Sequence, residues 1–376
     1  MSKFTSTLLL CWGIFCLACG KTTPDTPAPT PKETPDYVIR GLWLPNVDTQ
    51  ALNSREGLKQ VVNDCVTYGF NRIYVCVWNQ GYTHYPSQLM KDTFGVAINP
   101  KYEGRDPLKE LIEEAHAKKI KVIAWYEYGF ASDYSGSTTH ILDKKPTWAG
   151  RSQDGKVLTK SGFRWLNAFD PAVQKFMIDL ILEAVKNYDI DGIQGDDRLP
   201  ALPVEGGYDD MTKALFKKET GQDAPSNTLD SQWLNWRTGK LNGFMEQLYT
   251  QVKAAKKSCI VSMAPSIFPW GRDNYLQDWP TWVKNGWVEE IIPQVYRYDI
   301  ASYQNELNKV VNTQVPKERL SILSPGVLLK AGSYVATPEF LKQMTDANRK
   351  AGLPGEVFFH YEGLKTRKDF FGGLYQ

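Results

Sequence analysis

The amino-acid sequence of 376 residues predicts an α/β fold, a (β/α)8 TIM barrel, preceded by a signal peptide and a tether rich in proline and threonine. Two observations predict the barrel: short apolar runs alternate with segments of helical period along the chain, and there are eight such runs. Several runs are apolar on both faces, as expected for parallel strands that helices cover on both sides. A doubly wound open sheet is the alternative, but no glycine-rich nucleotide-binding motif follows the first run.

The eight predicted strands share an apolar centre and end at polar or turn-forming residues. They span residues 38–45, 71–78, 121–128, 190–196, 259–265, 290–296, 320–326 and 356–362. Three predicted helices between them begin with a capping side chain before a proline, at Asp106-Pro107, Asp170-Pro171 and Thr337-Pro338. The connections that follow the third and fourth strands, residues 129–170 and 197–228, are much longer than an ordinary loop of 2–6 residues. Since a barrel enzyme builds its active site at the C-terminal ends of its strands, these loops are expected to border the site.

The N-terminal residues predict export and a lipid anchor. Residues 8–19 form an apolar run too short to cross a membrane, which needs roughly 20 residues, but typical of an export signal. The run ends in Leu17-Ala18-Cys19-Gly20, which resembles a bacterial lipoprotein processing site with Cys19 as the lipidated residue. The predicted domains are therefore a signal peptide (1–18), the lipidated cysteine with a linker (19–36), and the barrel (37–376). Plain secretion and an uncleaved anchor are the alternatives.

Charge, cysteine and histidine content argue against nucleic-acid binding, a disulfide framework and a zinc site. The 44 basic and 42 acidic residues nearly balance, so no basic excess is present to bind nucleic acid. The three cysteines of the predicted barrel, Cys65, Cys76 and Cys259, are far apart and flanked by apolar residues, which favours buried free thiols over a disulfide framework. The four histidines have no zinc-site spacing, so we predict no metal and no cofactor.

Acidic residues stand at three of the predicted strand ends. They are Glu127, Asp196, Asp197 and Glu362. Glycoside cleavage needs one protonated carboxyl group to donate to the leaving oxygen and one ionised carboxylate. Aromatic neighbours of Glu127 predict a raised pKa, whereas polar neighbours predict that Asp196 stays ionised. We therefore predict Glu127 as the acid and Asp196 as nucleophile or base, with Glu362 or Asp197 as reserve partner.

Structural alternatives to these roles remain open at this point. Asp196 or Asp197 could cap a helix, pair with Arg198 or together hold a divalent cation, Glu127 could pair with a basic residue, and Glu362 could be a rim charge. Amides and rings near the same strand ends are predicted to shape sugar subsites. They are Trp78, Gln80, Trp125, Gln194, Arg198 and Tyr296.

The order of these motifs resembles that of the bacterial glycosyl-hydrolase-like family 10 proteins. The matching stretches are RGLWL (40–44), AWYEYGF (124–130), WLN (165–167), NYDIDGIQGDD (187–197), GYD (207–209), PQVYRY (293–298) and FFHYEGL (358–364). The resemblance implies a TIM-barrel glycosidase of the cell envelope, acting on the glycan of peptidoglycan or another polysaccharide. It also implies that Asp196 is the nucleophile, since Asp196 is the last residue of a D-G-[FI]-x-x-D motif. Gly195 and Arg198 depart from the family pattern, and the fifth strand carries no glutamate that could serve as the acid.

The predicted function is thus an envelope glycoside hydrolase, exported and anchored by lipid on the periplasmic or outer face. A non-catalytic lipoprotein that binds glycans in the same cleft is the alternative from another class. A weaker third reading is a barrel that acts on phosphorylated substrates through Pro325-Gly326 and the loop after the eighth strand.

Overall fold

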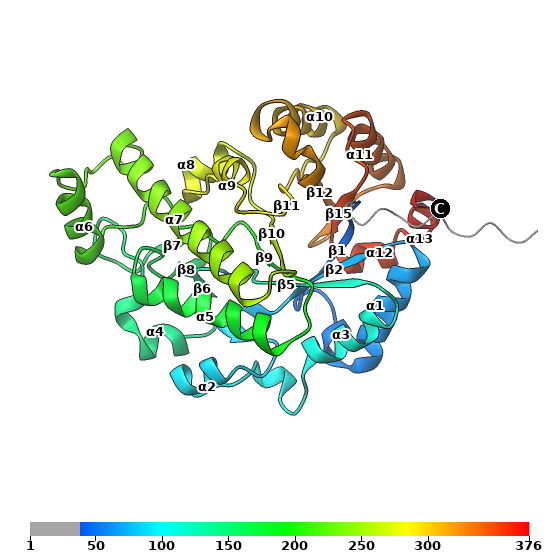
Figure 1. Cartoon of the computed structure of the whole chain (residues 1–376), viewed down its shortest axis with the longest axis horizontal. Coiled ribbons are helices and arrows are strands. Elements are labelled where there is room, and N and C mark those ends of the chain that lie inside the picture. The colour runs from blue at the N-terminus through cyan, green and yellow to red at the C-terminus, as the bar shows by residue number, and fades with distance from the viewer. Residues whose placement is uncertain (1–37, 376) are drawn as a thin grey trace, which may run out of the picture. The chain divides into compact units, whose positions relative to one another are not determined.

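A curled parallel sheet of eight strands lies at the centre of residues 38–375, the part of the chain that the computed structural model describes (Figure 1). The strands are β1 (Arg40–Leu44), β2 (Arg72–Cys76), β5 (Lys121–Trp125), β9 (Gly192–Gly195), β10 (Ile260–Met263), β11 (Glu290–Ile291), β12 (Gly326–Leu328) and β15 (Glu356–Phe359). Their order in the sheet is β11-β10-β9-β5-β2-β1-β15-β12, so neighbours in the sheet follow one another along the chain except where the first strand, β1, pairs with the last, β15. The predicted α/β class is confirmed. The predicted signal peptide, Cys19 and linker fall outside the described residues.

The two outer strands of this sheet approach each other. Isolated parallel bridges join Ile291 to Leu323 and Gln294 to Gly326. The Gly326 amide donates a hydrogen bond to the carbonyl of Pro293, at 2.9 Å, and the Val295 amide donates to the carbonyl of Gly326, at 3.1 Å. These contacts bring the segment after β11 next to the start of β12, so the sheet curls back toward itself.

The helices of the described residues cover the outer face of the sheet or lie in the connections that extend from it (Figure 1). They are α1 (Arg55–Thr67), α2 (Gln88–Phe94), α3 (Pro107–His116), α4 (His140–Lys144), α5 (Pro171–Asn187), α6 (Asp210–Thr220), α7 (Ser231–Ala255), α8 (Trp270–Tyr275), α9 (Trp279–Asn285), α10 (Ile300–Lys309), α11 (Pro338–Lys350), α12 (Tyr361–Lys365) and α13 (Lys368–Leu374). The three predicted capping residues accept hydrogen bonds from the first turns of α3, α5 and α11. Each of these helices has proline at its start, where the missing N–H costs no hydrogen bond.

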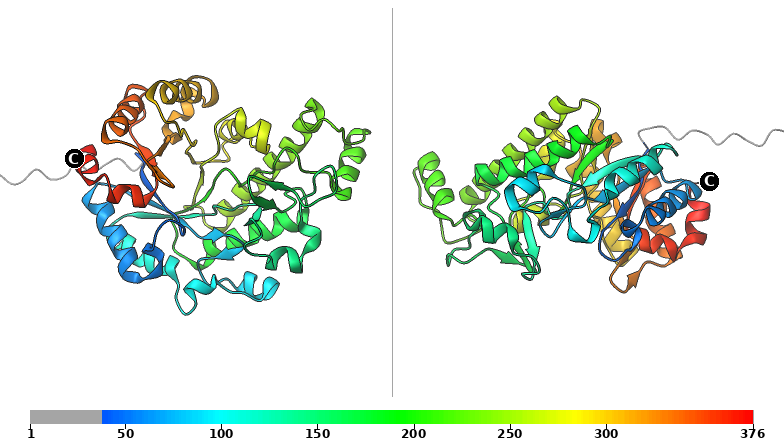
Figure 2. Two further views of the ribbon diagram at one scale, coloured as in Figure 1. Left: turned by 180° about the vertical axis from the view of Figure 1, so that it is seen from behind. Right: turned by 90° about the horizontal axis from the view of Figure 1, so that it is seen from below.

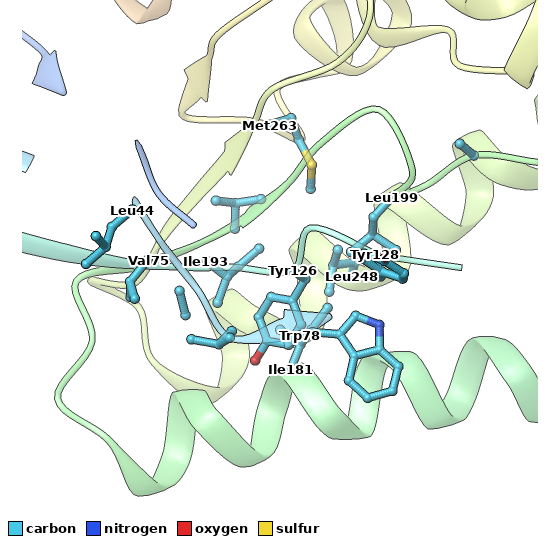
Figure 3. Packing of buried hydrophobic residues seen from close by; sticks show 14 of the residues in the cluster. Leu44, Val75, Trp78, Tyr126, Tyr128, Ile181, Ile193, Leu199, Leu248 and Met263 are labelled. Carbon is cyan, nitrogen blue, oxygen red and sulfur yellow. The ribbon is translucent and has the colours of Figure 1, made fainter. Parts of the chain in front are cut away.

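Alternating side chains of the strands divide the core into an outer and an inner layer. Figure 3 shows Leu44, Val75 and Ile193 of the sheet near Ile181 of α5 and Leu248 of α7, all in the outer layer. The inner layer fills the space enclosed by the sheet, and its members include Ile39, Trp43, Tyr74, Cys76, Ile123, Trp125, Ala264, Ile292 and Val357. Because successive residues of a strand face opposite sides, the inner residues alternate in sequence with the outer ones.

Both long connections are present and carry structure of their own. A three-stranded antiparallel sheet of β6 (Ala131–Tyr134), β8 (Phe163–Trp165) and β7 (Thr159–Lys160) follows β5, and α6 lies in the connection after β9. Two small hairpins, β3 (Trp78–Asn79) with β4 (Tyr82–Thr83) and β13 (Lys330–Ala331) with β14 (Tyr334–Val335), follow β2 and β12. In the right-hand view of Figure 2 the green β6–β8 region and the orange β13–β14 hairpin project toward the same lower edge.

Two predicted strands are displaced from their expected positions. The seventh was predicted at residues 320–326, but Lys317–Ile322 is a 3-10 helix with no buried residue, and β12 begins only at Gly326. The eighth ends at Phe359, and the helix α12 begins at Tyr361, so Glu362 lies on a helix and not at a strand end.

The described cysteines are unpaired, and the described helices do not match a membrane span. Cys65, Cys76 and Cys259 are buried free thiols, as predicted. Within residues 38–375, none of the helices combines the length and the apolar character that a membrane span requires.

Candidate active site

A cavity of about 220 Å³ opens at the C-terminal ends of the strands. Its lining comes from the ends of six strands or the residues just after them, namely Trp43, Trp125, Glu127, Asp196, Asp197, Arg198, Ala264, Gln294, Tyr296 and Phe359. Three carboxylates and one guanidinium are therefore enclosed by aromatic and amide side chains.

Glu127 is held by donors on one of its two oxygens. Its Oε2 accepts a hydrogen bond from Asn79 Nδ2 at 2.7 Å and from Cys76 Sγ at 3.3 Å. Its Oε1 faces Arg198 Nη2 at 3.5 Å. Burial raises the pKa of Glu127, although the charge of Arg198 and the Asn79 hydrogen bond act against that rise. When Glu127 is protonated, the proton belongs on Oε1, because both donors already occupy Oε2.

Asp196 is more deeply buried than Glu127 and is surrounded by N–H donors. Its side chain is 3% exposed. The carboxylate accepts from Trp125 Nε1 at 3.0 Å and from the Arg198 backbone amide at 3.1 Å, and Arg198 Nη2 lies 3.4 Å away. Burial raises the pKa of Asp196 well above its ordinary value, opposed by Arg198 and reinforced by the charges of Asp197 and Glu127. The expectation of a solvated, polar setting for Asp196 is therefore wrong.

Arg198 contacts all three carboxylates of the cavity. Its Nη2 serves both Glu127 and Asp196, and its Nη1 lies 3.1 Å from Asp197 Oδ1. Its Nε donates to the Glu127 carbonyl oxygen at 2.8 Å, and its guanidinium lies over the rings of Tyr128 and Phe163. These contacts fix the guanidinium, so one positive charge is shared among three acids.

The shared contact with Arg198 Nη2 limits the separation of the two buried acids. The distance from Glu127 Oε1 to Asp196 Oδ2 cannot exceed the sum of 3.5 Å and 3.4 Å. That limit includes the roughly 5–5.5 Å typical of a retaining glycosidase pair. Because the charge of Glu127 raises the pKa of Asp196, the pair holds one proton across an interval of pH. The Trp125 and Arg198 donors stabilise the ionised form of Asp196, against the burial that favours its protonated form.

Aromatic rings form a wall of the cavity beside the acids. Phe359 lies against Trp43, Trp125 and Tyr296, with ring centres 5.9, 6.4 and 5.6 Å apart. Burial, with the charges of Asp197 and Asp196, raises the pKa of Tyr296 well above its ordinary value, so its phenol stays protonated. A ligand in this cavity would therefore meet both aromatic rings and carboxylates.

Six of the predicted site residues line this cavity. They are Glu127, Asp196, Asp197, Trp125, Arg198 and Tyr296. Gln194 lies beneath it, fully buried, where its Oε1 accepts from Trp43 Nε1 at 2.7 Å and its Nε2 donates to Ser262 Oγ at 3.0 Å. These two hydrogen bonds make Gln194 a support for Trp43.

Three further predicted residues lie outside the lining. Trp78 is fully buried in the outer core and donates to the Gly129 carbonyl. Gln80 accepts hydrogen bonds from the Ser137 and Thr138 hydroxyls and so fastens the connection after β6. Glu362 accepts from Thr49 Oγ1 and Lys365 Nζ, both at 2.7 Å.

Several residues of the site were not among the predicted site residues. They are Trp43, Ala264, Gln294 and Phe359 in the lining, and Asn79 and Cys76 behind Glu127. Strand alternation could have indicated Trp43 and Cys76, since both lie on the inner parity of their strands. Within the described part of the chain, no group of three or more His, Cys, Asp or Glu side chains is arranged to hold a metal ion.

A protein-family model and two named relatives match this chain. A model of the family described as glycosyl hydrolase-like 10 matches residues 38–325. The protein named glycosyl hydrolase YngK of Bacillus subtilis is 24% identical over 292 residues, which cover 69% of this chain and 54% of that protein, so the chain spans about half the length of this relative. Glycosyl hydrolase DigH of Escherichia coli is 21% identical over 421 residues and covers 95% of this chain and 92% of that protein.

Solved structures show the same fold. The glycoside hydrolase domain of PgaB (BpsB) from Bordetella bronchiseptica aligns with a TM-score of 0.67 at 13% identity, over 89% of this chain and 97% of that domain. The catalytic domain of β-amylase from Paenibacillus polymyxa aligns with a TM-score of 0.59 at 12% identity, over 88% of this chain and 94% of that domain. At these identities the likeness concerns the fold alone.

Proposed function

The chain belongs to the glycosyl hydrolase-like 10 family, and from this membership we propose that it hydrolyses O-glycosidic bonds of a cell-envelope glycan. The substrate would be the glycan strand of peptidoglycan or another polysaccharide. One observation carries the proposal: two buried carboxyl groups, those of Glu127 and Asp196, reach the same nitrogen of Arg198 on one cavity. Both acids follow neighbouring strands, β5 and β9, at the end of the sheet where barrel enzymes place their catalytic groups.

In this proposal the two acids have different roles. Glu127 donates its proton from Oε1 to the oxygen of the leaving sugar as the bond from that oxygen to the anomeric carbon breaks. Asp196 either attacks the anomeric carbon or takes a proton from the water that attacks it. Arg198 stabilises the negative charge that Glu127 acquires after it has given up its proton. Asp197, held by the same guanidinium, is the reserve acid.

We further propose that the protein is exported and anchored by a lipid on Cys19, on the evidence of residues 1–36 alone. Growth of a producing bacterium with radiolabelled palmitate should label the full chain in the membrane fraction. Cys19→Ala should lose the label. An unlabelled parent chain would contradict the anchor without touching the hydrolase proposal.

The test of the hydrolase proposal is product release from defined glycans. The full chain is incubated with purified peptidoglycan and with a panel of soluble polysaccharides, and released fragments are identified by mass spectrometry. A double variant, Glu127→Gln with Asp196→Asn, is the matched control because each change keeps the side-chain shape. We expect new reducing ends from the parent alone. Binding of a glycan with no cleavage by the parent would instead support a non-catalytic glycan-binding protein.

A further inference from the structure

Exposed aromatic side chains are concentrated where strands of the sheet end. Among the described residues, the aromatic rings with large exposure are Tyr134, Trp270 and Tyr298. They follow β5, β10 and β11, three of the strands whose ends build the cavity. An exposed ring is costly to leave in water, so a group of them on one face indicates a surface that is covered when the protein works.

Tyr298 stands directly outside the cavity wall. It is 70% exposed and lies two residues after Tyr296, which lines the cavity. Two residues of chain span at most roughly 7 Å, so the Cα atom of Tyr298 lies within that distance of the Cα atom of Tyr296. Tyr334 of the β13–β14 hairpin holds Tyr298 edge-on, with ring centres 4.9 Å apart and planes at 86°. Since Tyr334 itself packs against the core, Tyr298 has a fixed support and an open face.

Tyr134 stands at another side of the same cavity. It is 46% exposed and is paired across the β6–β8 ladder with Phe163, at 5.1 Å between ring centres. Phe163 in turn lies 4.9 Å from the guanidinium of Arg198. A Cβ atom on Gly162 would lie 2.6 Å from the Tyr134 ring, so that ring lies closely against the backbone.

The sheet order separates the two exposed tyrosines. Tyr298 follows β11 and Tyr134 follows β5, and β10 and β9 lie between these strands. Both segments leave the same end of the sheet, and the two strands between them carry Asp196 and Ala264 of the cavity lining directly after their ends. Each ring is tied to the cavity, one through Tyr296 and one through Phe163 and Arg198.

We propose that Tyr298 and Tyr134 are sugar-binding platforms on two sides of the acids, and that the substrate is a glycan chain extending beyond the cavity in both directions. This inference rests on the proposed function and sharpens it, since a chain held on both sides is cut at internal bonds. A pyranose ring presents an apolar face of C–H groups that packs on an aromatic ring, while its hydroxyl groups remain in water. The cavity of about 220 Å³ is too small to enclose a chain, so further sugars must lie outside it.

The test compares short and long oligosaccharides by calorimetry on the full chain. The probes are dimers and hexamers of β-1,4-linked N-acetylglucosamine, glucose, xylose and mannose. Because a hexamer reaches the platforms and a dimer does not, we expect the hexamer of at least one sugar to bind about tenfold more tightly than its dimer. Tyr298→Ala and Tyr134→Ala should each remove most of that gain, and Tyr298→Phe should retain it.

Val66→Ala is the matched control, since Val66 is 50% exposed but lies on α1, away from the strand ends that form the site. The proposal is overturned if no hexamer binds more tightly than its dimer. It is also overturned if the two alanine variants bind the hexamer like the parent, or if Val66→Ala weakens binding as much as they do. Hexamer binding that depends on the tyrosines without cleavage of any glycan would leave the platforms standing and defeat the hydrolase proposal.

Discussion

The two ends of the central sheet both carry charged cavities, and they differ in how the charges are matched. The N-terminal end holds the larger cavity, about 620 Å³, against about 220 Å³ at the C-terminal end. Around the larger cavity the acids have basic partners of their own, in the pairs Arg72–Glu290, Lys253–Glu289, Lys256–Asp189 and His116–Asp191. At the smaller cavity one guanidinium serves three carboxylates. The volume of a cavity therefore does not identify the candidate active site.

The mismatch at the C-terminal end has chemical consequences. Burial raises the pKa of both Glu127 and Asp196, so protons are held where a reaction can use them. At the opposite end the hydrogen bond and charge of Lys256 lower the pKa of Asp189, which stays ionised. We infer that the N-terminal charges stabilise the fold and that the C-terminal charges serve chemistry, at a cost in stability.

The largest expected effect is on catalysis by Glu127. In Glu127→Gln the amide oxygen can still accept the hydrogen bond from Asn79, but the side chain can no longer donate a proton to the leaving group. The hydrolysis rate should therefore fall about 10²- to 10⁴-fold. The rate is measured as new reducing ends on the glycan that the parent cleaves. Glu289→Gln at the opposite end is the control and should change the rate less than twofold. Equal losses in both variants would contradict the division of roles between the two ends.

The next effect is on stability at the N-terminal end. Arg72 and Glu290 form a buried ion pair, and Tyr74 also donates to Glu290, at 2.8 Å. Arg72→Met leaves the Glu290 carboxylate buried beside the phenol without its cation, so the free energy of unfolding should fall by about 3–5 kcal/mol. Urea unfolding measures the loss, and the hydrolysis rate per folded molecule should not change.

A double variant distinguishes the loss of the cation from a loss of packing at Arg72. Arg72→Met with Glu290→Leu removes both charges and should recover most of the lost stability. If the double variant is as unstable as Arg72→Met, lost packing and not an unpaired charge explains the effect.

The smallest effect is a pH dependence of stability with opposite signs at the two ends. The pKa of Asp196 is raised in the folded protein, so its stabilising contribution is present below the unfolded pKa near 4 and is lost as pH rises. The pKa of Asp189 is lowered, so its contribution is present above that pKa and is lost as pH falls. From pH 4 to 8, the parent should lose stability relative to Asp196→Asn and gain slightly relative to Asp189→Asn. Thermal unfolding across this range measures both, and equal slopes would contradict the contrast.

The fold could be read from the sequence because its signals are local. Apolar runs and proline-marked helix starts, such as Asp170-Pro171, predicted the strand and helix order. The seventh strand was misplaced because residues 320–323 form a short apolar run like that of a strand, although β12 pairs with β15 only from Gly326 onward. The type of an element was thus predictable where the periodic segment was long, whereas the bounds of the three-residue strand β12 were not.

The site could be predicted only in part, because side-chain direction depends on where each strand ends. The polar and aromatic residues at predicted strand ends correctly included Trp125, Glu127 and Tyr296, which all line the cavity. On the second strand the chain leaves the sheet after Cys76 and starts the β3–β4 hairpin, so Asn79 reaches Glu127 while Trp78 packs in the outer core. The central position of Arg198 depends on contacts with Glu127, 71 positions earlier, which no local pattern contains.

The most direct test of the central claim compares two aspartates on either side of one strand. Asp196 follows β9 at the cavity, and Asp189 precedes β9 at the other end of the sheet. The initial rate of glycosidic-bond cleavage is measured for Asp196→Asn and Asp189→Asn on the glycan that the parent cleaves. The account predicts that Asp189→Asn cleaves at the parent rate and that Asp196→Asn releases at least about 10³-fold fewer reducing ends in the same time. Cleavage by Asp196→Asn at the parent rate would contradict it.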